Sequence, residues 1–129
     1  MQRLTNLETE KIGPQLWRLI RPLVFTTGAK LISVPMGFIT DGASCPAILW
    51  TLCAPMTGPQ AEAAVLHDFL YSKDSNYPEI GRAEADKMFL EGMIANGTSA
   101  WRAKAIYAGV RSCGMHSWKK CCSIDKIKG

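Results

Sequence analysis

The chain has 129 residues, of which 47% are hydrophobic and 20% charged, and its formal net charge is +4. This length suits one domain with its own core, and the composition excludes a disordered or fibrous chain. The mild charge and the lack of an RNA-binding, zinc-finger or helix-turn-helix signature argue against specific nucleic-acid binding. No apolar run reaches the roughly 20 residues of a membrane span, and no signal-peptide core follows Met1, so we expect a cytoplasmic protein.

The N-terminal part of the sequence favours antiparallel β-structure. Residues 1–13 are polar, which is typical of a surface extension or an edge element. Partial alternation over 15–20 and the β-forming residues at 23–27 predict strands, and 31–35 predicts the returning strand of a hairpin. Pro35 is expected at the end of that strand, because it has no amide hydrogen to give to a ladder.

A connection rich in turn-forming residues follows the hairpin. Asp41 and Ser44 can bond nearby backbone amides, and Ser44 is placed to cap a short helix over 46–53. Two interpretations of Thr40, Asp41 and Ser44 remain open. They form either a tight, capped strand-to-helix turn or a loop that presents oxygens to a cation or a substrate.

Three longer helices are predicted in the rest of the chain. They cover residues 58–71, 79–95 and 99–113, and an Asn-Gly pair separates the second from the third. The short polar connection 72–78 favours an antiparallel pairing of the first two. We therefore expect an α+β fold, with a small N-terminal antiparallel hairpin or sheet followed by three to four helices around a central antiparallel pair.

The central helical pair carries the side chains with the most chemistry. His67 and Asp86 each lie about two turns into their helices, so the pairing brings them level. A carboxylate bonded to an imidazole fixes its tautomer and raises its basicity, and Tyr71 on the same face can orient the site or close the core. The alternative is a buried polar network, with Asp86 bonded to His67 and Asp68 to Arg82 or a loop amide. Arg82 and Asp86 are also spaced as a surface ion pair.

The five cysteines do not form a disulfide framework, and their odd number suits a reduced protein. Cys113, His116, Cys121 and Cys122 offer four soft ligands within ten residues. Adjacent cysteines rarely bind one metal through both sulfurs, so a zinc site is not favoured there. We interpret residues 113–129 as a Cys- and Lys-rich tail of a single domain that spans 1–129.

Three linked motifs carry a resemblance to a known family: VPxGFxTDxASxP at residues 34–46, AAxxHDxLY at 63–71 and RxxxDxxF at 82–89. In this order they resemble the phage and prophage family of unknown function numbered 1353, over about residues 15–112. The resemblance implies a protein of a tailed bacteriophage or an integrated prophage, made in the host cytoplasm. Its partners would be other virion proteins or a component of the host envelope.

A second similarity bears on chemistry. The His67-Asp68 pair and the following Asp86 are similar to the paired helices of bacterial phospholipase A2. That similarity implies His67 as general base for a water, Asp68 as a calcium ligand and Asp86 as the carboxylate that orients His67. Calcium binds carboxylate and carbonyl oxygens and would stabilise the oxyanion of an attacked ester. The flanking disulfides and the glycine-rich calcium loop of the phospholipases are absent, so the turn at 40–44, with Asp41, would replace that loop.

Two hypotheses from different classes follow. The first is a small phage hydrolase, assisted by a metal and acting on an ester or amide bond of the host envelope, with Thr40, Ser44 and Arg82 near the substrate. The second is a non-catalytic virion component of the tail or neck, in which the His-Asp cluster stabilises the fold. A soluble factor that interacts with the host is a third possibility.

Overall fold

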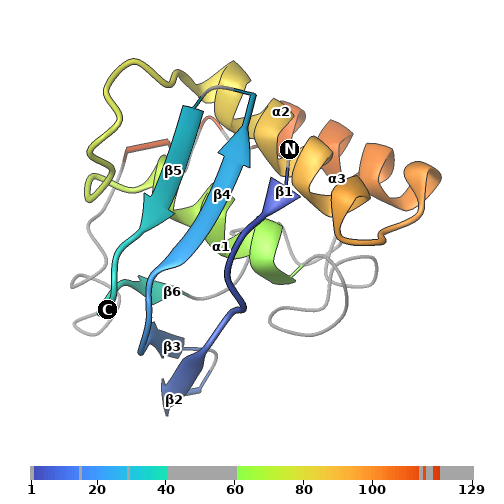
Figure 1. The fold of residues 1–129 in the computed structure, drawn as a ribbon. Helices are drawn as coiled ribbons and strands as arrows, with labels where there is room; N and C mark the ends of the chain where they lie inside the picture. The colour runs from blue at the N-terminus through green and yellow to red at the C-terminus, as the bar shows by residue number, and fades with distance from the viewer. Residues whose placement is uncertain are drawn as a thin grey trace.

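The computed structural model describes residues 2–14, 16–28, 30–40, 61–113, 115 and 118–119. Within these ranges six strands precede three helices along the chain (Figure 1). The strands form two three-stranded sheets in which every pair is antiparallel. The α+β architecture expected from the sequence is confirmed.

The first sheet contains the predicted hairpin. Its strand order is β1-β4-β5, with β1 at Gln2–Arg3, β4 at Leu23–Thr27 and β5 at Lys30–Val34. Phe25 of β4 pairs with Ile32 of β5, and both side chains are fully buried. Gly28 in the turn has φ +59°, a left-handed conformation that glycine adopts without steric cost. The last hairpin strand ends immediately before Pro35, as expected.

The second sheet contains the strand whose Thr40 bonds to Asp68 of the first helix. Its order is β2-β3-β6, with β2 at Thr9–Gly13, β3 at Leu16–Leu19 and β6 at Ile39–Thr40. Trp17 of β3 pairs with Thr40 of β6. Gly37 has φ +91° in the turn before β6, and its amide donates to the Leu19 carbonyl at 2.8 Å. The polar N-terminal stretch thus holds β1 and β2, each at the edge of its sheet.

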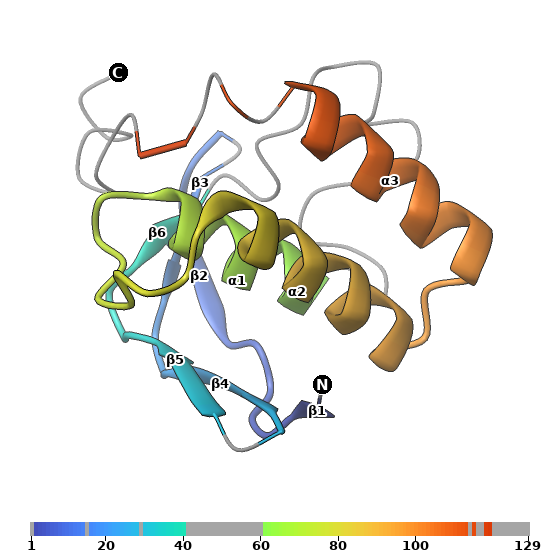
Figure 2. The ribbon, with the colours of Figure 1, turned by 90° about the horizontal axis from the view of Figure 1, so that it is seen from above.

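The first two helices pack against the strands, and the third packs against those two helices. The three helices are α1 at Ala61–Tyr71, α2 at Arg82–Ala95 and α3 at Ala100–Cys113. Every residue of α1 except Glu62 is buried. Its Leu66 and Phe69 pack with the strands, whereas Ala63 and Ala64 pack with α2 and α3. In Figure 2, α3 lies on the far side of α1 and α2 from the strands.

The connection between α1 and α2 is longer than the sequence indicates. We expect α2 to begin at Glu79, but it begins at Arg82. Ile80 inserts its side chain into the core, at 2% exposure, and the backbone at Gly81 is extended, with φ −81° and ψ 175°. Burial of one apolar side chain therefore displaces the first helical turn. Tyr77 ties the connection to β5, since its Oη accepts the Ser33 amide at 2.9 Å.

Several sequence predictions fall outside the described residues. These are the short helix over 46–53, the helix start at 58–59, Asp41, Ser44 and the zinc candidates His116, Cys121 and Cys122. Among the residues that the structure describes, α1, α2 and α3 lack the combination of length and apolar content that a transmembrane helix requires.

Candidate functional site

The candidate site lies where α1 and α2 cross at their buried faces. His67 Nε2 is 2.7 Å from Asp86 Oδ1, and the two side chains are 4% and 0% exposed. Tyr71, one turn after His67, also reaches Asp86, and Arg82, one turn before Asp86, reaches Tyr71. These cross-links run in opposite directions along the two helices, so the expected antiparallel pair is confirmed. The structure brings His67, Tyr71, Asp86 and Arg82 together.

Two other helices supply donors to the carboxylate of Asp86: α1 through His67 and Tyr71, and α3 through Arg111. Tyr71 Oη of α1 donates to Oδ1 at 2.5 Å, and Arg111 Nη1 of α3 donates to Oδ2 at 2.7 Å. Burial acts to raise the pKa of Asp86. The hydrogen bonds from His67, Tyr71 and Arg111 outweigh that effect, and the pKa lies below its ordinary value. Asp86 is therefore an ionised carboxylate at neutral pH.

His67 is enclosed by aromatic rings. Its imidazole stacks on Phe89, with 4.5 Å between ring centroids and 27° between planes, and the Tyr71 ring centroid is 4.2 Å away. Burial lowers the pKa of His67 more than the bond to Asp86 raises it. The ring is therefore neutral at pH 7. Because the Asp86 carboxylate can only accept, the proton is on His67 Nε2 and the lone pair is on Nδ1.

Arg82 connects the site to the end of α3. Its Nε donates to Tyr71 Oη at 3.1 Å, and its Nη2 donates to the carbonyls of Val110 and Arg111 at 2.8 and 2.7 Å. Its Nε also lies 4.0 Å from Asp86 Oδ2. The pair with Asp86 is thus not a surface ion pair, because the carboxylate is fully buried. Arg82 also turns toward Tyr71 and α3 rather than toward Asp68.

Asp68 faces a different neighbour from His67. Successive helical residues point about 100° apart, so Asp68 is directed toward β6 instead of α2. Thr40 Oγ1 donates to Asp68 Oδ2 at 2.7 Å, and both residues are buried. Within the described ranges no group of three or more His, Cys, Asp or Glu side chains is placed to share a metal ion. The predicted second ligand, Asp41, is outside those ranges, so the calcium site stays a prediction.

Two features of the site were not predicted from the sequence. Arg111 is 25 positions from Asp86, and an arginine in the last turn of a helix is already accounted for by the helix dipole. Lys119, in the expected tail, donates through its amide to the Tyr71 carbonyl at 2.6 Å. Trp118 packs edge-on against the Tyr71 ring, with 5.0 Å between centroids. These contacts join residues that are far apart in the sequence, so no local sequence pattern predicts them.

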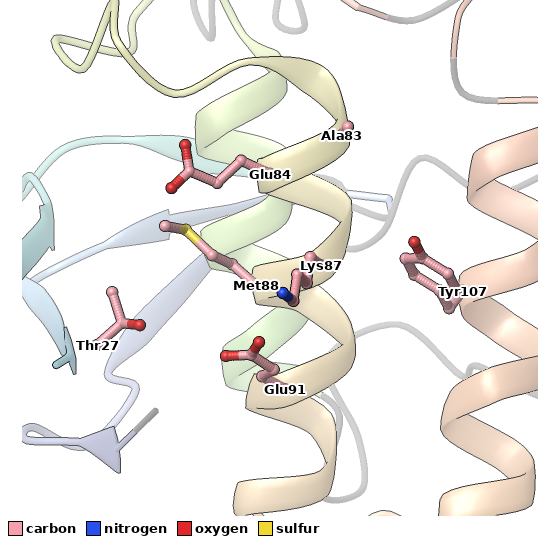
Figure 3. A pocket seen from close by; sticks show the side chains of 7 residues that line it. All are labelled: Thr27, Ala83, Glu84, Lys87, Met88, Glu91 and Tyr107. Carbon is pink, nitrogen blue, oxygen red and sulfur yellow. The ribbon is translucent and has the colours of Figure 1, made fainter.

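A hollow of about 440 Å³ lies on the opposite face of α2 (Figure 3). It is bordered by Thr27 of β4, by Tyr107 of α3 and, along α2, by Ala83, Glu84, Lys87, Met88 and Glu91. The α2 residues repeat at three- and four-residue spacing, which defines one helix face. Asp86 and Phe89 occupy the other face, so this hollow contains none of the predicted site residues.

Comparisons with known proteins place the site within a family match. A family model described as "Protein of unknown function (DUF1353)" matches residues 17–110. The chain is similar to the uncharacterized protein y4jT of Sinorhizobium fredii, with 35% identity over 82 residues. The matched region covers 63% of this chain and 23% of that protein. This chain thus spans less than two thirds of the relative's length. No solved structure matches it. The family match includes His67 and Asp86 and ends one residue before Arg111.

Proposed function

We propose that this chain, which belongs to the DUF1353 family of proteins of unknown function, is a small hydrolase of ester or amide bonds. The observation that carries the proposal is the pairing of a neutral His67 with an ionised Asp86 through Nε2. That tautomer leaves Nδ1 as the basic atom, which is the arrangement of a general base oriented by a carboxylate. Tyr71 and Arg111 hold the carboxylate in place.

In the proposed reaction, His67 Nδ1 takes a proton from a water molecule while the water oxygen bonds to the carbonyl carbon of the substrate. The imidazolium that forms is stabilised by Asp86, whose charge lies 2.7 Å from Nε2. When the bond to the leaving alcohol or amine breaks, Nδ1 returns the proton to the leaving oxygen or nitrogen. The ring ends neutral, and the products are an acid and an alcohol or amine.

Calcium is the cation that we propose for Asp68, together with Asp41, since hard divalent ions bind carboxylate oxygens. When bound, it would polarise the substrate carbonyl. Thr40 orients the Asp68 carboxylate through its 2.7 Å hydrogen bond, which suits a ligand held by a neighbouring group. The described residues alone do not complete a ligand set, and the steps above use only the protein's own groups.

The biological setting is part of the same proposal. The three sequence motifs support a phage or prophage origin, with synthesis in the host cytoplasm. A bond in the host envelope is then the substrate class, since a phage must cross the envelope at entry and at exit. Ser44 would lie beside the substrate, on the turn that follows Thr40.

The decisive experiment combines an activity assay with a calcium titration. Wild type would be assayed on fluorogenic phospholipid vesicles and on purified peptidoglycan, beside His67→Ala, Asp86→Asn and the control Glu91→Gln on the outer face of α2. Loss of a general base lowers the rate by roughly 10²–10⁴-fold, so the first two variants should lose activity and the control should keep it. Calorimetry should show calcium binding that Asp68→Asn abolishes and His67→Ala retains. Wild type inactive on both substrates would refute the proposal.

A second candidate function is a non-catalytic virion component of the tail or neck. The observation that favours it is the complete burial of Asp86, with donors to both carboxylate oxygens. In that case the cluster would serve only to join three helices. The result that supports this candidate is an inactive wild type without calcium binding, together with a large loss of stability in all three site variants and recovery of the protein in purified phage particles.

A further inference from the structure

We propose that three residues that follow the family match, Arg111, Trp118 and Lys119, hold the His67 site in its working geometry. In this inference Arg111 is a positioning residue for Asp86, and Trp118 with Lys119 forms a clasp on the end of α1 that carries Tyr71. The catalytic meaning of the inference rests on the proposed function, whereas the contacts that it concerns do not. These three residues are thus part of the site and not of an accessory tail.

Arg111 controls the orientation of the Asp86 carboxylate. Oδ1 accepts from both His67 and Tyr71, whereas Oδ2 is held by Arg111 at 2.7 Å. A carboxylate can rotate about its Cβ–Cγ bond, and rotation here would take Oδ1 away from the imidazole. The charged bond at Oδ2 opposes that rotation, because bonds between ionised groups are shorter and stronger than neutral ones. Arg111 therefore acts on His67 through Asp86.

The bond from Arg111 closes a ring of hydrogen bonds. The Arg111 carbonyl accepts from Arg82, Arg82 donates to Tyr71 Oη, Tyr71 donates to Asp86, and Asp86 accepts from the Arg111 guanidinium. Each member is held from two sides, and bonds in such a chain polarise one another. The α3 terminus is thereby fixed to the same two helices whose side chains form the site. Loss of any one member loosens the others.

The clasp holds Tyr71, the member of that ring that lies at the end of α1. Lys119 Nζ donates to the carbonyls of Leu70 and Ser72 at 3.0 and 3.1 Å, and its amide donates to the Tyr71 carbonyl. Carbonyls at a helix C-terminus have no intrahelical partner and favour a cation nearby. Lys119 keeps these contacts at φ +56°, which a non-glycine residue rarely adopts. Together with Trp118, these bonds set the position of the Tyr71 backbone and ring.

The test is the NMR signal of the His67 Nε2 proton, recorded on the full chain in a His116→Gln background, which leaves His67 as its one histidine. Arg111→Met removes the bond to Oδ2, whereas Arg111→Lys keeps a cation that can donate to it. Arg102→Met is the matched control, because Arg102 is an exposed arginine on the same helix. Lys119→Met probes the clasp.

We expect Arg111→Met to increase the rate of solvent exchange of this proton roughly tenfold to a hundredfold, the range that a charged hydrogen bond supports. Arg111→Lys should restore slow exchange, Lys119→Met should give a smaller increase, and Arg102→Met should give none. An Arg111→Met protein that melts at a lower temperature but keeps wild-type exchange would overturn the inference, because a purely structural arginine predicts that pattern. The readout needs no substrate, so an inactive wild type would refute the hydrolase and leave this result standing.

Discussion

The two faces of α2 differ in whether their charged side chains are buried and bonded to partners. On the inner face Asp86 is fully buried and bonded to His67, Tyr71 and Arg111. On the outer face three charged side chains border the hollow, Glu84, Lys87 and Glu91. In the part of the chain that the structure describes, none of these three side chains forms a hydrogen bond or an ion pair. One helix thus carries an organised carboxylate and, on its other face, unpaired charges in contact with water.

The difference follows from the cost of burial. A charge removed from water must be compensated by partners, whereas a charge at the surface keeps its hydration. Asp86 therefore requires its donors, and those donors fix the tautomer of His67. The charged side chains around the hollow are not held by partners in this way. The volume of the hollow therefore does not identify it as the reactive site. Substitutions on the two faces should consequently have very different effects.

The largest effect is expected for Asp86→Ala. Removing the carboxylate leaves the buried donors of His67 and Tyr71 without an acceptor, which lowers the free energy of unfolding by about 1–3 kcal/mol for each group, and also removes the partner of Arg111. Urea unfolding at pH 7 measures this loss. Asp86→Asn keeps the shape and one acceptor oxygen, so its loss should be smaller. A loss below about 1 kcal/mol for Asp86→Ala, within the range of an exposed pair, would show that the inner face is not distinctive.

A smaller loss is expected for Arg82→Met. Arg82 donates to Tyr71 and to two carbonyls at the end of α3, and hydrogen bonds from a charged group contribute about 1.5–3 kcal/mol. Methionine keeps the aliphatic packing of the side chain and removes only the donors. We expect a loss of about 2 kcal/mol in urea unfolding, with amide exchange faster at the end of α3. Unchanged exchange at Val110 and Arg111 would contradict the role of Arg82 in holding α3.

The inner face also predicts a dependence of stability on pH. The pKa of His67 is lowered from 6.5, chiefly by burial, so the unfolded chain takes up a proton before the folded chain does. The contribution of neutral His67 to the free energy of unfolding is fully present above pH 6.5. It decreases as the pH drops toward the lower pKa of the folded state. The pKa of Asp86 is lowered from 3.8, because hydrogen bonds outweigh burial, and its contribution is lost as the pH falls through that lower value.

Thermal unfolding between pH 8 and pH 3 checks this dependence. The wild type should lose stability in the window below pH 6.5, and His67→Gln should lack that part of the loss. Asp86→Asn should lack the part at the most acidic end. If the wild type were equally stable at pH 7 and pH 5, neutral burial of His67 would be wrong.

Much of the fold could be predicted because its signals are local. β-forming residues on both sides of Gly28 predict the β4–β5 hairpin, and an Asn-Gly pair marks the end of α2 and separates it from α3. The start of α2 could not be predicted as well. Ile80 is placed by its burial among residues far away in the sequence, and that tertiary contact overrides a sequence that would continue the helix.

Some contacts of the candidate site could also be predicted from the sequence, and others could not. His67 and Asp86 could be paired from the sequence because each lies a short distance from one connection, so a helical hairpin alone brings them together. Arg111 could not be assigned to Asp86, since its contact depends on how α3 packs across α2. Thr40 was predicted as part of a loop, and its bond to Asp68 depends on where β6 meets α1.

The smallest effects are expected on the outer face of α2. Glu91→Gln and Lys87→Met each remove a charge that has no partner among the described residues, and surface substitutions of this kind usually change stability by less than about 0.5 kcal/mol. The exchange rate of the His67 Nε2 proton should also stay at the wild-type value, because Asp86 and its donors lie on the opposite side of the helix. If Lys87→Met accelerated that exchange as strongly as Arg111→Met, the two faces would be coupled through the helix itself. The contrast between them would then have to be explained by the rigidity of α2 and not by the burial of charge.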